Sequence, residues 1–145
     1  MDITVLHLHD DVEAARLLRL YEFSYPNLRI HVTPKYGKFD VNTVRKYLDK
    51  SSVVVLFIFD QNVSFDERTE LELKEAIKLR KPIVVVAPSN FDIPNFLLNY
   101  DNVKIYAPSK KYILEFFERS EQKGNTLDLL IYKLLSEIHL RSKVA

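Results

Sequence analysis

Seven polar side chains in this sequence could bind a nucleotide. Each lies in a segment that follows an apolar run, where a predicted strand has ended and a loop begins. They are His9, Asp10, Tyr36, Asp60, Gln61, Asn62 and Ser89. Their carboxylate, amide, imidazole and hydroxyl groups donate or accept the hydrogen bonds that orient a small polar ligand. Helices that begin in the same segments would add free backbone amides, which favour anions such as phosphate. The sequence therefore predicts a ligand site built from loops.

Several other kinds of site are excluded by composition. The chain has no cysteine, so disulfides, thiolate zinc sites, iron–sulfur ligation and cysteine nucleophiles are all ruled out. It has only two glycines, Gly37 and Gly124, and neither a glycine-rich dinucleotide loop nor a P-loop can be built from them. A metal site is not expected either, because the pair His7 and His9 has no third histidine or cysteine close by in the sequence.

The elements that would position these side chains alternate between strand and helix. Short apolar runs typical of buried parallel strands occupy 3–8, 28–32, 53–59, 83–86 and 103–106. Helical apolar spacing follows each run, and a last amphipathic helix carries Leu127, Leu130, Leu134 and Ile138. Ser64 and Glu67 have the spacing of a capping box, which predicts that the central helix begins there.

This alternation predicts an α/β fold with a parallel sheet covered on both faces. We expect a flavodoxin-like three-layer sandwich whose five strands lie in the order 2-1-3-4-5, in a single domain over 1–145. Within it, 1–120 would form the core and 125–142 an additional C-terminal helix that completes the packing of one face or mediates dimerisation. Ligands in such sheets bind beyond the carboxyl ends of the strands, here between the first and third strands.

The segment 51–87 also resembles the Toll/interleukin-1 receptor (TIR) domain and its bacterial and archaeal TIR-like relatives. Its apolar strand is followed by a helix with Glu72, Leu73 and Ala76, and Lys81-Pro82-Ile83 then opens the next strand. The loop 33–40 falls where that family has its mobile loop after the second strand. The resemblance covers the whole chain in topology, but in residues it is concentrated in this segment.

The resemblance implies a nucleotide-binding domain that hydrolyses NAD. In catalytic TIR domains the helix glutamate supports cleavage of the nicotinamide–ribose bond, and the matching position here is Glu72. A carboxylate suits this role because the bond breaks through a cationic ribosyl species. NAD would then be the substrate, and no cofactor would be required.

A phosphorelay receiver domain has the same topology and stays open as an alternative. Receivers carry an acidic pair after the first strand and an acceptor aspartate after the third, and Asp10, Asp11 and Asp60 fall near those places. Ser89 and Lys110 lie near the other receiver positions. Three carboxylates in one crevice could hold Mg²⁺, with Asp60 as the phosphorylated residue. Asp10 and Asp11 would otherwise serve as helix caps.

The expected partners are small nucleotides, another protein or a second copy of the chain. A net charge of +1 gives no global field that would attract nucleic acid or an acidic membrane. No apolar run approaches the roughly 20 residues of a membrane-spanning helix. The cysteine-free composition fits a cytoplasmic location. A non-enzymatic interaction module of the same fold remains a further interpretation.

Overall fold

The computed structural model describes residues 1–21, 29–33, 40–123 and 126–144, and it contains a sheet in the middle of the molecule. In the described residues the sheet has five strands in the order β2-β1-β3-β4-β5, and every neighbouring pair is parallel. The strands are β1 (Asp2–Leu6), β2 (Arg29–Val32), β3 (Val53–Phe57), β4 (Ile83–Val86) and β5 (Val103–Tyr106). The predicted fold class and strand order are therefore confirmed.

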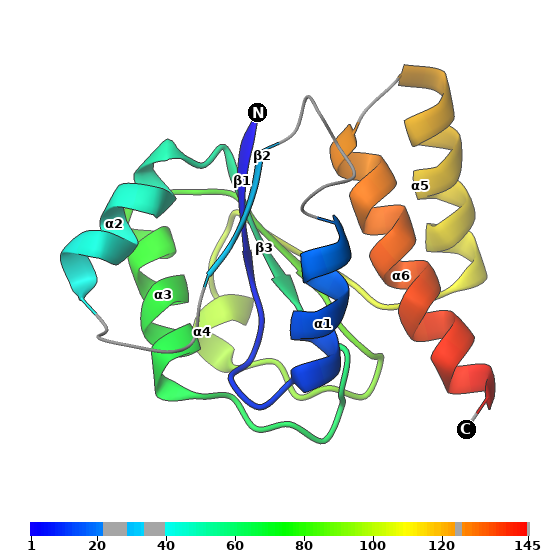
Figure 1. Ribbon diagram of the computed structural model, residues 1–145, viewed down its shortest axis with the longest axis horizontal. Helices are drawn as coiled ribbons and strands as arrows, with labels where there is room; N and C mark the ends of the chain where they lie inside the picture. Colours follow the sequence, from blue (N-terminus) through cyan, green and yellow to red (C-terminus); the bar gives the residue numbers. More distant parts are fainter. Residues whose placement is uncertain (22–28, 34–39, 124–125, 145) are drawn as a thin grey trace.

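Helices cover both faces of the sheet, as Figure 1 shows. On one face lie α2 (Val41–Lys50), α3 (Glu67–Lys78) and the short α4 (Asn95–Leu98). On the other face lie α1 (Val12–Tyr21), α5 (Lys110–Lys123) and α6 (Thr126–Val144). Alternate residues of a strand point to opposite faces, so Val55 and Phe57 enter the core under α1 and α6, whereas Leu56 enters the core under α2 and α3. This arrangement explains why the strands are apolar without alternation.

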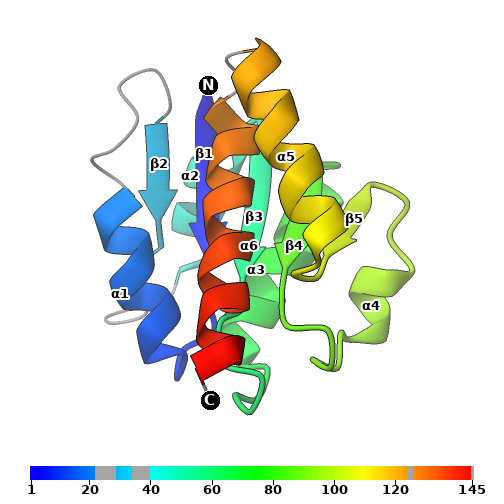
Figure 2. The same ribbon diagram turned by 90° about the vertical axis from the view of Figure 1, so that its right-hand side faces the viewer.

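The C-terminal helix α6 packs directly on the sheet rather than at its margin. It crosses the sheet between α1 and α5 (Figure 2). Leu130 and Leu134 have no exposed surface, and Ile138 is 5% exposed. Leu135 is also fully buried, although it lies outside the single apolar stripe expected from the sequence. The helix needs apolar residues on more than one side because it packs against α5 as well as against the strands.

The predicted start of α3 is wrong, and the helix begins later. Asp66, not Ser64, is the N-cap, and its carboxylate accepts a hydrogen bond from the backbone N–H of Thr69. A carboxylate at this position satisfies an amide that has no partner within the helix, and it complements the positive end of the helix dipole. Ser109 caps α5, because its hydroxyl accepts a hydrogen bond from the backbone N–H of Tyr112.

A left-handed residue follows the C-cap of α3. Arg80 has φ of 59°, and its backbone N–H donates to the carbonyl of Ile77. This geometry closes the helix just before Pro82 starts the approach to β4. Among the described residues, no helix is long and apolar enough to cross a membrane.

Candidate functional site

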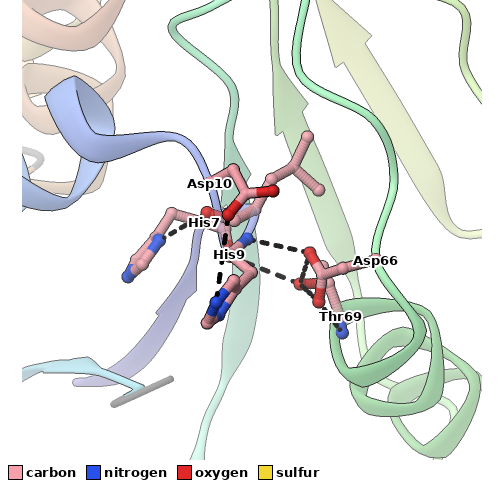
Figure 3. Close-up of polar contacts among 6 residues, drawn as sticks. His7, His9, Asp10, Asp66 and Thr69 are labelled. Atoms are coloured by element: carbon pink, nitrogen blue, oxygen red, sulfur yellow. Dashed lines mark hydrogen bonds and ion pairs between the residues drawn. The ribbon is translucent and has the colours of Figure 1, made fainter. Parts of the chain in front are cut away.

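The loop after β1 is tied to the beginning of α3 (Figure 3). The backbone N–H of His9 donates to Oδ1 of Asp66 at 2.8 Å, and the Thr69 hydroxyl donates to the carbonyl of His7 at 3.3 Å. His7 is buried, and its Nδ1 lies 2.9 Å from the carbonyl oxygen of Leu8. The side chain of His9 is instead half exposed, so the two histidines do not share one environment.

Asp11 joins the loops that follow β1 and β3. Its carboxylate accepts hydrogen bonds from the backbone N–H groups of Phe59 at 2.8 Å and Asp60 at 3.3 Å. It also accepts from the N–H of Ala14, as expected for a cap of α1. The side chain is buried, and burial raises its pKa even though the three amide bonds favour the charged form. Asp11 therefore holds together the two loops at the carboxyl edge of the sheet through a buried side chain.

The other residues predicted at this edge are at the surface. Asp10 and Asp60 are exposed, and the Asp60 carboxylate accepts a hydrogen bond from the backbone N–H of Asn62 at 2.9 Å. Gln61 and Asn62 are exposed beside them, and Ser89 is exposed after β4. Tyr36 lies outside the described residues. The Asp11 carboxylate, not these exposed side chains, thus holds the loops after β1 and β3 together.

Glu72 is fully buried in the second turn of α3. Its Oε2 accepts a hydrogen bond of 2.8 Å from the hydroxyl of Tyr47, which belongs to α2. Burial raises the pKa of Tyr47 strongly, and the charge and hydrogen bond of Glu72 raise it further, while Arg68 opposes the shift. The sequence pointed to Glu72 but not to Tyr47, because the pairing depends on how two helices pack.

A second buried carboxylate, Glu75, lies one turn further along α3. It is paired with Arg45 of α2 at 2.9 Å and with Lys78 at 3.3 Å. The Arg45 hydrogen bond holds the pKa of Glu75 below its usual value, against the effect of burial. Glu75 therefore forms a structural ion pair between α2 and α3, and the Tyr47 hydroxyl links Glu72 to α2 as well.

Tyr47 also lines a cavity of about 650 Å³ between α2 and the edge strand β2. Its ring lies against that of His31, with 5.1 Å between the ring centroids. The lining includes the first residues of β1 and β2, so the cavity reaches the amino edge of the sheet. Of the residues predicted to bind a nucleotide, the six that the structure describes are not part of that lining. The hollow next to the Glu72–Tyr47 pair is thus away from the edge where a ligand was expected.

No metal site is formed by the part of the chain that the structure describes, since no group of three or more His, Cys, Asp or Glu side chains could hold an ion there. No protein-family model matches the chain, and neither a curated protein nor a solved structure matches it. The observed sheet and layers define an α/β domain of flavodoxin-like topology.

Proposed function

We propose that this chain is a TIR-like nucleotide-binding domain that hydrolyses NAD at the nicotinamide–ribose bond, with Glu72 as the catalytic residue. The observation that carries the proposal is the buried Glu72 carboxylate, held by Tyr47 between α2 and α3. A buried carboxylate costs folding free energy. Such groups are enriched at functional sites, where a low-dielectric surrounding strengthens their effect on a developing charge. The segment that resembles the TIR family includes the same residue.

The reaction would proceed by departure of nicotinamide. The bond between the ribose C1′ and the ring nitrogen breaks, its electron pair stays on nicotinamide, and positive charge develops on the ribosyl group. The Glu72 carboxylate stabilises that charge or orients the ribose hydroxyls. Water then adds to C1′ and releases a proton, which leaves ADP-ribose.

Tyr47 would control access to Glu72 in this scheme. Glu72 has no exposed surface, and one of its oxygens is occupied by the Tyr47 hydroxyl. Movement of the Tyr47 side chain would free that oxygen for a hydrogen bond to the ribose. Tyr47 is partly exposed and lines the cavity, so it has an open side toward which it can move.

The test is release of nicotinamide from NAD by the pure protein. Glu72→Gln keeps the size of the side chain and an oxygen acceptor for Tyr47, and we expect it to abolish release. Glu70→Gln is the matched control, because Glu70 lies on the same helix but is half exposed and paired with Lys74. Thermal unfolding of both variants would show that they are folded. No release by the wild type, or equal release by Glu72→Gln and wild type, would refute the proposal.

The receiver alternative is less well supported by the geometry. A receiver would use the acidic residues after β1 to hold Mg²⁺, yet the carboxylate of Asp11 is already occupied by three backbone amides. Asp60 itself is exposed and could accept a phosphoryl group. Incubation with acetyl phosphate and Mg²⁺, followed by mass measurement, would detect that modification. Negative results in both assays would favour the non-enzymatic interaction module.

A further inference from the structure

The cavity between α2 and β2 has an excess of positive charge. Among the described residues of its lining, three side chains are basic, namely Arg29, Lys46 and Lys50, and one is acidic, Asp2. These described residues together give the wall two net positive charges, whereas the whole chain has a net charge of only +1. Positive charge gathered around a hollow raises the local concentration of anions.

The two lysines of this cavity are not neutralised by carboxylates that the structure describes. Lys46 and Lys50 are four residues apart on α2, so they lie on the same side of the helix, and no ion pair with a described carboxylate involves them. Arg29 does face Asp2, but at 3.8 Å and with 87% of the arginine side chain exposed. Such a pair is weak, and the arginine can turn toward a ligand.

The cavity also offers an aromatic side chain on which a planar ring could stack. His31 on β2 is exposed, and its imidazole is supported from one side by the ring of Tyr47. Exposed, pre-positioned aromatic surface is what a planar heterocycle stacks on. The volume of about 650 Å³ lies in the range of pockets for small organic ligands and exceeds what a phosphate group alone would fill.

We propose that this cavity binds a phosphorylated small molecule with a planar ring, such as a nucleoside diphosphate. Lys46 and Lys50 hold the phosphate groups, with Arg29 close by, and the ring lies against His31. The site is at the amino edge of the sheet, on the opposite side from the loops that carry Asp10 and Asp60. Binding here does not require that the chain hydrolyse NAD, so the two proposals can fail separately.

Titration calorimetry with ADP, pyrophosphate and adenosine tests the proposal. ADP should bind more tightly than either of the other two, because pyrophosphate lacks the ring and adenosine lacks the charge. Its affinity should fall as salt is added, since exposed charges are screened. In proton spectra the imidazole resonance of His31 should shift with ADP, and this is readable because the chain has four histidines.

The double variant Lys46→Gln, Lys50→Gln should weaken ADP binding about tenfold, as expected for the loss of two exposed charge contacts. Its control is Lys104→Gln, Lys111→Gln, which removes the same charge from β5 and α5, where both lysines are exposed. The control should bind ADP as the wild type does. Absence of ADP binding, equal affinities of the two double variants, or adenosine binding as tightly as ADP would overturn the proposal. Pyrophosphate binding as tightly as ADP would overturn the claim that the ring of the ligand binds against His31.

Discussion

The buried hydrogen bond between Tyr47 and Glu72 can be tested by removing the hydroxyl alone. Tyr47→Phe keeps the ring beside His31, so no large cavity is created, but Glu72 loses a donor at 2.8 Å where its side chain has no contact with water. A hydrogen bond to a charged group contributes about 1.5–3 kcal/mol. We expect the free energy of unfolding at pH 7 to fall by about this amount.

Urea unfolding of four proteins, namely the wild type, Tyr47→Phe, Glu72→Gln and the double variant, would isolate the interaction. The loss caused by Tyr47→Phe should be smaller by about 1 kcal/mol when residue 72 is glutamine, because a neutral amide accepts a weaker hydrogen bond. If Tyr47→Phe costs less than about 0.5 kcal/mol, or if the two losses simply add, the pair does not contribute as argued.

The same pair predicts a dependence of stability on alkaline pH. Burial and the neighbouring Glu72 raise the pKa of Tyr47 above its usual value of 10.0, so the folded protein keeps a proton that the unfolded chain releases. The stabilisation is fully present below pH 10.0 and is lost as the pH rises toward the folded-state pKa. Above pH 10.0 the wild type should lose about 1.4 kcal/mol per pH unit more than Tyr47→Phe does. Parallel curves for the two proteins would contradict this.

Four further predictions concern the parts that hold the fold. Asp11→Ala should lower the free energy of unfolding by about 2–3 kcal/mol in urea, because three backbone N–H groups lose their acceptor. Leu134→Ala should cost about 2–5 kcal/mol, because the side chain is fully buried between α6 and the sheet, and a loss close to zero would contradict that packing. Arg80→Gly should raise stability by up to about 1 kcal/mol, since glycine adopts a φ of 59° without strain. Glu75→Gln should lower the melting temperature at pH 7, because the Arg45 hydrogen bond lowers the pKa of Glu75. That difference should disappear as the pH falls through the lowered pKa, and a constant difference would show that Arg45 is not its cause.

Much of the architecture could be predicted from local patterns. The run 53–59 is almost entirely β-branched and aromatic, which is typical of a strand covered on both faces. Pro82 ends the helix pattern before the fourth strand, and Ser109 marks the start of the helix after the fifth strand. Each of these signals depends on a few neighbouring residues, and the alternation of strands with helices then restricts the topology to a small number of choices.

The start of α3 shows where such patterns mislead. Ser64 and Glu67 have the spacing of a capping box, but Asp66 is closer to the first turn and also accepts a hydrogen bond from the backbone of His9. A contact between residues 57 positions apart in the sequence therefore fixes where this helix begins. The spacing of capping residues alone could not show whether Ser64 or Asp66 is the N-cap of α3.

The amino-acid sequence alone determined which segments become strands and helices, because periodicity and helix-breaking residues act over a few positions. Tertiary packing decided which hydroxyl reaches Glu72, which cations face one hollow beside β2, and that α6 lies against the strands. These relations join residues that are distant along the chain. The distances between these residues depend on how the helices pack on the sheet, and a local sequence pattern does not determine that packing.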